Sequence, residues 1–340
     1  MGNLSHIKIE GFKSIKKLDL EMKPINVLIG ANGSGKSNFI SSLLLLKYID
    51  PRELRIYMAQ KGGADSFLHF GSKVTDGISI NTTYDSDYNI NTIFFKDDKD
   101  DEFLRVDGRP KKVALEEFIK FLDGLMVYHF QDTSSTAKFK SHQKIFDYDF
   151  LRSDAKNIAP FLYRLKNEFN PDYQQIVQAI QTVAPYFYDF VLEPVGSENE
   201  ESILLRWQHK NDLDNVFSAS QLSDGTARFI CMAVLFLQPK RLRPKTIVLD
   251  EPEIGLHPTA IAVLSEIIQA VANDGSQVII STQSVELANY FEPDDFIVVD
   301  YENGESKFKR LDVKDLGDWI ETYQVGEAWS EGLLGGEPKW

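Results

Sequence analysis

The stretch that decides the fold is Gly30-Ala31-Asn32-Gly33-Ser34-Gly35-Lys36-Ser37. It follows the apolar run of residues 25–29 and precedes a helix-like run at residues 39–44. A strand, a glycine-rich turn, a lysine, a hydroxyl residue and a helix in this order are typical of a loop that cradles phosphates. Glycines let successive backbone N–H groups face an anion, and the helix N-terminus adds partial positive charge.

This loop predicts a bound nucleoside triphosphate with its magnesium ion. We expect the Lys36 ammonium to bridge the outer phosphates and the Ser37 hydroxyl to ligate Mg²⁺. The residues expected to hold ATP in this loop are Gly30, Asn32, Gly33, Ser34, Gly35, Lys36, Ser37 and Asn38.

The composition indicates a large soluble protein. The chain has 340 residues, of which 43% are hydrophobic, so it can bury the core of one large domain or two ordinary ones. The single cysteine, Cys231, excludes an internal disulfide and favours a reducing compartment. The N-terminus shows no basic-then-apolar leader, and the longest apolar runs fall far short of the ~20 residues of a membrane span. We therefore predict a cytoplasmic protein with no membrane partner.

The net charge bears on nucleic-acid binding. The formal charge is −14, and an acidic protein is repelled at long range by a phosphate backbone. Two local basic clusters keep such binding open, although solvated surface lysines explain them equally well. Their members are Lys138, Lys140 and Lys144 in one, and Lys240, Arg241, Arg243 and Lys245 in the other. Nucleic acid is thus a possible partner that the sequence does not strongly indicate.

The order of elements predicts an α/β fold. Alternating strands are expected near the N-terminus and again at residues 77–81 and 90–95, and helical periodicity occupies residues 153–185. From residue 226 onward, helices and apolar strands alternate, which is typical of a parallel sheet covered by helices. We predict a parallel core sheet with the phosphate loop, an N-terminal antiparallel β subdomain and a helical insertion.

Two carboxylates follow a buried strand at residues 246–249. Ligands bind at the carboxyl ends of strands in such sheets, which is where Asp250 and Glu251 stand. Asp250 is expected to hold Mg²⁺ through water, because this ion keeps several waters and takes few protein carboxylates. Glu251 is expected to orient and deprotonate the attacking water.

The segment Leu222-Ser223-Asp224-Gly225 precedes a long apolar helix. Ser223 is a good helix N-cap, and capping alone explains it. A capped helix start also offers N–H groups and a hydroxyl to an anion, so a phosphate-binding role stays open as well.

These motifs, in this order, resemble an ABC-type ATPase head of the RecF, SMC and OLD group. The phosphate loop, Leu-Ser-Asp-Gly, the strand ending in Asp250-Glu251-Pro252 and the later Ser281-Thr282-Gln283-Ser284 carry the resemblance, which covers residues 5 to about 300. The opening Ile9-Glu10-Gly11-Phe12-Lys13-Ser14-Ile15 is also similar to the start of those heads. The likeness is to a compact bacterial subfamily without a coiled coil.

The resemblance implies a role for five further residues. Two such heads clamp two ATP molecules, so Ser223 and Gly225 would contact the γ-phosphate held by the partner copy. Gln131 would sense the Mg²⁺ ion, with a surface polar residue as the alternative. Lys13 would approach the phosphates from the first hairpin, or else be merely solvated. Gln283 would take the place of the histidine that many ABC heads direct at the γ-phosphate, as a hydrogen-bond donor that carries no charge.

The resemblance also implies one ABC-type ATPase domain over residues 1–340. Its expected segments are an N-terminal lobe (1–150), an insertion of helices and strands (151–215), a third lobe (216–311), and a C-terminal helix and tail (312–340). The third lobe contains the signature segment (residues 222–225), the two carboxylates and the sensor residue Gln283. Too few residues follow Gln283 for the nuclease domain of OLD-type proteins. We therefore predict a Mg²⁺-dependent dimeric ATPase switch that gates a separately encoded nuclease or toxin, in DNA repair or anti-phage defence. A DNA-end or DNA-structure sensor is the alternative.

Overall fold

The structure is a computed structural model that describes residues 3–84, 88–97, 100–107, 112–130, 132–134, 136–196, 201–312 and 324–336. The chain forms two compact units. Unit 1 consists of Met1–Val127, Lys245–Glu251 and Gly275–Trp340, and unit 2 of Tyr128–Pro244 and Pro252–Asp274.

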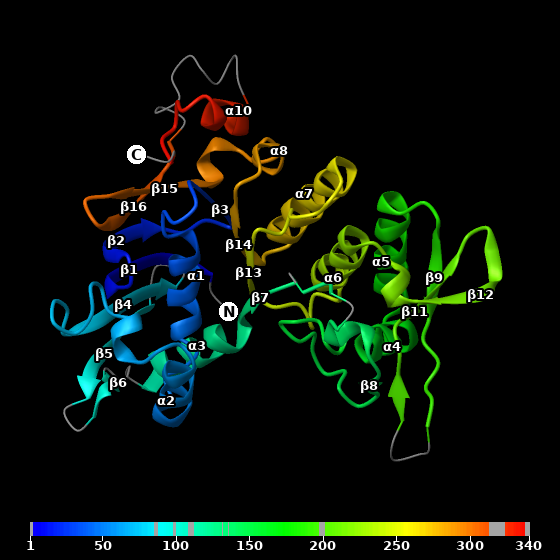
Figure 1. The fold of residues 1–340 in the computed structure, drawn as a ribbon, viewed down its shortest axis with the longest axis horizontal. Helices are drawn as coiled ribbons and strands as arrows, with labels where there is room; N and C mark the ends of the chain where they lie inside the picture. The colour runs from blue at the N-terminus through cyan, green and yellow to red at the C-terminus, as the bar shows by residue number, and fades with distance from the viewer. Residues whose placement is uncertain are drawn as a thin grey trace. The chain divides into compact units, whose positions relative to one another are not determined.

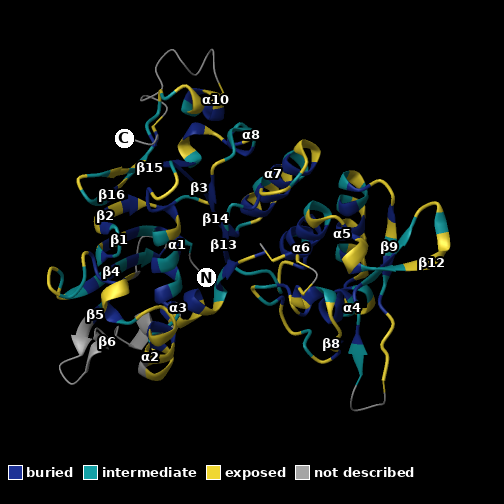
Figure 2. Cartoon of the chain, in the orientation of Figure 1, coloured by how far each residue is buried: buried dark blue, intermediate teal, exposed yellow. Residues whose placement is uncertain are grey.

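A six-stranded sheet forms the centre of unit 1 (Figure 1), with the strand order β16-β15-β3-β14-β13-β7. Its strands are β3 (Ile25–Ile29), β7 (Leu125–Tyr128), β13 (Thr246–Asp250), β14 (Gln277–Thr282), β15 (Phe296–Glu302) and β16 (Glu305–Arg310). The strands β13, β14, β3 and β15 pair in parallel, and β16 is antiparallel to β15. The central strands are rich in Val and Ile and buried along almost their whole length (Figure 2), as expected for parallel strands covered on both faces. The predicted parallel core sheet is confirmed.

A second sheet of unit 1 is antiparallel, with the order β2-β1-β4-β5-β6. Its strands are β1 (Leu4–Phe12), β2 (Ile15–Glu21), β4 (Gly77–Tyr84), β5 (Tyr88–Asp97) and β6 (Asp100–Asp107). In β4, buried and half-buried residues alternate, as expected for a strand with one face on a core. This sheet confirms the predicted N-terminal antiparallel β subdomain.

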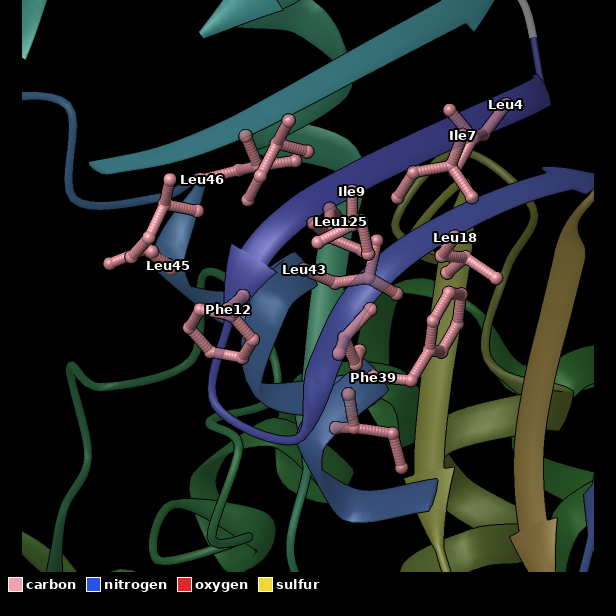
Figure 3. Close-up of a cluster of buried hydrophobic side chains, with 14 of the residues drawn as sticks. Leu4, Ile7, Ile9, Phe12, Leu18, Phe39, Leu43, Leu45, Leu46 and Leu125 are labelled. Carbon is pink, nitrogen blue, oxygen red and sulfur yellow. The ribbon is translucent and has the colours of Figure 1, made fainter. Parts of the chain in front are cut away.

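The core of unit 1 gathers around α1 (Figure 3). Phe39 and Leu43 of α1 share one fully buried cluster with Ile9 of β1 and Val248 of β13. Burying each of these side chains contributes about 1.5–3 kcal/mol, so α1 is firmly held where it follows the phosphate loop. The α-helices in the described residues of unit 1 are α1 (Lys36–Leu45), α2 (Pro51–Gln60), α3 (Lys112–Gly124), α8 (Val285–Ala288) and α10 (Val325–Ser330).

Within the described residues, unit 2 has more helix than strand and contains two small sheets. Its helices are α4 (Ile158–Glu168), α5 (Asn170–Val183), α6 (Asp224–Leu237) and α7 (Pro258–Asn273). One sheet has the order β12-β11-β9, and β8 pairs with β10. These strands are β8 (Gln143–Lys144), β9 (Phe187–Val191), β10 (Ser202–Ile203), β11 (Arg206–His209) and β12 (Asp212–Ser218). Within the described ranges, no helix combines the length and apolar character needed to cross a lipid bilayer.

Candidate functional site

The phosphate loop lies between β3, which ends at Ile29, and α1, which begins at Lys36. Its backbone requires glycine at two points of close approach. Gly30 has a φ of 153° and Gly35 a φ of 116°. A Cβ on Gly30 would overlap Val299 O, and one on Gly35 would overlap Ser306 Oγ. The two glycines therefore give the loop a curled backbone that a residue with a Cβ could not adopt without a clash.

Gly35→Ala is expected to reduce the free energy of unfolding by about 1–3 kcal/mol, because the new Cβ meets Ser306 in a backbone region that disfavours L-residues. Gly33→Ala is the matched control, since Gly33 also has a positive φ, of 79°, but has no atom within 4 Å of its ideal Cβ. Thermal unfolding of both variants measures the difference. Equal losses would contradict the role given to the Ser306 contact.

A pocket of about 120 Å³ opens at the loop. It is lined by Asn32, Gly33, Gly35, Lys36, Ser37, Asn38 and Glu251. The Lys36 ammonium donates to Gly30 O at 2.7 Å and to Ala31 O at 3.0 Å, so it lies across the loop itself. Ser34 is buried, and its Oγ has no hydrogen-bond partner in the part of the chain that the structure describes. A charged donor and a buried hydroxyl in one glycine-rich loop suit an oxyanion such as phosphate.

Both predicted carboxylates stand beside this pocket at the end of β13. Asp250 Oδ2 accepts a hydrogen bond from Ser37 Oγ at 3.1 Å. Asp250 Oδ1 accepts a second bond from Ser281 Oγ at the end of β14. A hydroxyl and a carboxylate at this separation form an oxygen donor set that suits Mg²⁺. The donor chemistry of the site thus fits the ion that the sequence predicts.

Glu251 lies next to this pair in a restrained conformation. Its φ is 49°, a region that few non-glycine residues occupy, and its N–H donates to Ser281 O at 2.9 Å. The Gln283 amide donates to Glu251 Oε1. The structure therefore brings together four predicted site residues from three elements of unit 1, namely Ser37, Asp250, Glu251 and Gln283.

Several contacts of the loop involve residues to which the sequence patterns assigned no role. Asn38 Nδ2 donates to Ser14 Oγ at 2.7 Å. Ser306 Oγ lies 2.6 Å from Ser14 Oγ and 2.5 Å from Ser34 O. Ser281, which bonds Asp250, is likewise a plain serine at a strand end. Ser14 and Ser281 lie within motifs quoted from the sequence, but the contacts of their hydroxyls, and that of Ser306, are visible only in the folded chain.

Lys13 lies in the turn between β1 and β2. Its ammonium is 5.4 Å from the ring centroid of Phe12 and 5.7 Å from that of Phe67. Burial and, to a smaller extent, the nearby Lys61 charge lower the pKa of Lys13. Its neighbour Ser14 contacts the phosphate-loop helix, but a direct role of the Lys13 ammonium at the phosphates stays a prediction.

The residues of the signature segment belong to unit 2. Ser223 is the N-cap of α6, and its Oγ accepts a hydrogen bond from Thr226 N at 3.2 Å. Gly225 lies so close to Gly255 O that a Cβ would overlap it. The buried Arg228 donates from Nε to Phe130 O at 3.0 Å and from Nη1 to Ile254 O. Burial lowers the pKa of this guanidinium. The start of α6 is thus anchored to residues 254–255.

Gln131 lies outside the described residues.

Some residues of each basic cluster form ion pairs or hydrogen bonds within the fold. Lys138 pairs with Asp154 at 3.5 Å, and Lys140 donates to Thr133 O at 2.6 Å. Lys240 pairs with Asp274 at 2.6 Å, and Arg243 pairs with the same carboxylate.

A protein-family model described as "AAA domain, putative AbiEii toxin, Type IV TA system" matches residues 25–289, well over half of the chain. The chain belongs to this AAA_21 family. This family is one of ATPases. The match, together with the similar structures below, confirms the expected resemblance to ABC-type ATPase heads. No curated protein matches the chain.

Solved structures similar to this AAA_21 member include SMC heads. One is an Smc head bound to the C-winged helix domain of ScpA, with 17% identity, a TM-score of 0.66, and coverage of 94% of this chain and 99% of that chain. A second is an Smc head with an extended coiled coil bound to the C-terminal domain of ScpA from Pyrococcus furiosus, with 15% identity, a TM-score of 0.62 and coverage of 94% and 99%. A third is the SMC head domain from Thermotoga maritima, with 16% identity, a TM-score of 0.50 and coverage of 92% and 100%. The predicted fold class, an ATPase head, is thereby confirmed.

Proposed function

We propose that this chain binds ATP and Mg²⁺ and hydrolyses the nucleotide. The observation that carries the proposal is the Glu251 carboxylate, held by the Gln283 amide beside the Ser37–Asp250 pair. Lys36 and the loop N–H groups bind the phosphates, and Ser37 and Asp250 hold the metal ion, which when bound neutralises phosphate charge. Glu251 orients a water and takes its proton. Lys13 and Gln131 are assigned supporting roles at the phosphates and the metal.

We also propose that two copies close on two ATP molecules. Each nucleotide then lies between the phosphate loop of one copy and Ser223 and Gly225 of the other. The capped N-terminus of the 14-residue helix α6 supports this, because its N–H groups and partial positive charge attract an anion. The contact of Gly225 with Gly255 and the Arg228 bonds keep that helix start in place.

The ATP state of the dimer is proposed to gate a separately encoded nuclease or toxin in the cytoplasm, in DNA repair or anti-phage defence. The matched family carries a toxin and a type IV TA system in its description, and the Smc head of one similar structure is bound to ScpA. Both names support a protein partner. Direct DNA sensing is less well supported, because basic residues of both clusters are bonded within the fold.

Ser223→Asp is expected to prevent ATP-dependent dimer formation while leaving ATP binding intact. Aspartate caps a helix as well as serine does, so α6 stays stable, but its charge repels the partner's γ-phosphate. Light scattering after size exclusion, with ATP and Mg²⁺ in a Glu251→Gln background, measures the mass. Ser141→Asp adds the same charge at an exposed serine of unit 2 and is the control. If the Ser223→Asp variant still formed a dimer with ATP, the proposed binding of ATP between two copies would be contradicted.

A further inference from the structure

Three loops of unit 1 that meet beside the phosphate loop each hold a non-glycine residue with a positive φ. These residues are Lys13 (47°), Phe70 (57°) and Asn303 (52°). His69 Nδ1 lies 2.7 Å from Lys13 O, which joins the first loop to the second. Phe70 lies against Gly304, which joins the second to the third. Left-handed backbone is unusual for large side chains, and such strain concentrates where a protein grips a ligand.

Phe70 is the most conspicuous of the three, because its ring is held out to solvent. The residue is 63% exposed, whereas Phe12 and Phe67 nearby are buried. The ring packs against His69, with centroids 4.4 Å apart and planes inclined by 60°. It also lies over Gly304, where a Cβ would come within 2.8 Å of Phe70 Cζ. The ring is therefore positioned from two sides while most of its surface stays open.

The ring stands close to the phosphate loop. Ser14, next to Lys13, contacts Asn38 of the pocket at 2.7 Å. Ser306 lies 2.5 Å from Ser34 O, and Gly304 precedes it by two residues, which is about 7 Å along a strand. Phe70 is thus linked to the loop that cradles phosphates by two short routes, one through Lys13 and Ser14 and the other through Gly304 and Ser306.

We propose that Phe70 is the stacking platform for the base of the bound nucleotide, and so distinguishes nucleoside triphosphates from bare polyphosphate. This rests on the proposed ATP site. A phenyl ring offers a flat apolar face and no hydrogen-bonding group, so it recognises a purine by its π-face and treats ATP and GTP alike. Stacking of this kind changes affinity by about 5- to 150-fold.

The test compares two ligands, ATP and inorganic tripolyphosphate, by calorimetry in a Glu251→Gln background that prevents turnover. Phe70→Ala is expected to raise the Kd for ATP by about 5- to 150-fold and to leave the Kd for tripolyphosphate unchanged. Phe70→Trp, which keeps an aromatic face, is expected to restore ATP affinity. Phe146→Ala is the matched control, since Phe146 is 62% exposed but belongs to unit 2.

Three results would overturn the inference. Undiminished ATP affinity in Phe70→Ala removes the ring from the site. An equal loss for ATP and tripolyphosphate assigns the ring to the shape of the loop, and not to the base. If the protein with Phe70 intact binds tripolyphosphate but not ATP, no base is recognised. Failure to bind either ligand would instead contradict the proposed function itself, which keeps the two failures distinguishable.

Discussion

Glu251→Gln is expected to slow ATP hydrolysis by about 10²- to 10⁴-fold while ATP binding persists, because glutamine fills the same space but takes no proton from water. The carboxylate that it replaces already lies within hydrogen-bonding reach of Gln283 and beside the Ser37–Asp250 pair. The side-chain oxygen of glutamine can still accept the Gln283 amide, so the local geometry is preserved. Phosphate release at saturating ATP measures the rate, and calorimetry measures binding.

Glu266→Gln is the control for this change. Glu266 is an exposed residue of α7, so the same loss of charge occurs away from the pocket. Its ATPase rate should match that of the unaltered protein. Hydrolysis at the unaltered rate in Glu251→Gln would remove Glu251 from the role of general base and leave the proposal without its main support.

The parts of the site that local sequence signals determine could be predicted. The glycine-rich loop follows a strand and opens a helix, and the carboxylates Asp250 and Glu251 follow a Val- and Ile-rich strand. Each signal lies within about ten residues, and the parallel sheet brings strand ends together. The fold class alone was therefore enough to predict that the loop and Asp250 lie close together. The 3.1 Å hydrogen bond from Ser37 Oγ to Asp250 Oδ2 agrees with this prediction.

Contacts between distant, chemically ordinary residues could not be predicted. Ser14 and Ser306 are 292 positions apart, yet their hydroxyl oxygens lie 2.6 Å from each other beside the loop. Phe70 is one of 23 phenylalanines, and only its backbone conformation and exposure distinguish it. Such features depend on tertiary packing. Secondary-structure propensity and hydrophobic periodicity report local structure only and do not show these contacts.

The helix α2 shows a different kind of omission. The patterns used above predict no helix at residues 51–60, although the signal is present. Asp50 caps the helix, accepting from Arg52 N at 2.8 Å, and Pro51 occupies its first turn. A capping residue followed by proline is a strong helix start. The local sequence was therefore sufficient to predict α2, and the prediction omitted it.

Lys36→Ala is expected to weaken ATP binding by about 10²- to 10³-fold, because truncating one partner of a buried charge pair costs several kcal/mol. Lys36 is only 5% exposed, and its ammonium already lies over the carbonyls of its own loop. When ATP binds, the Lys36 ammonium exchanges these neutral carbonyl partners for charged phosphate oxygens, so the lysine contributes strongly to the binding free energy. Calorimetry in the Glu251→Gln background measures the Kd.

Two variants make this result interpretable. Lys36→Met keeps most of the apolar stem, so an equally weak Kd with an unchanged unfolding midpoint would assign the loss to the ammonium and not to a collapsed loop. Lys17→Ala removes a lysine whose side chain is 73% exposed and paired with Glu10 at 3.4 Å, and it should leave the Kd unchanged. An unaltered Kd in Lys36→Ala would show that the loop does not hold phosphate through this lysine.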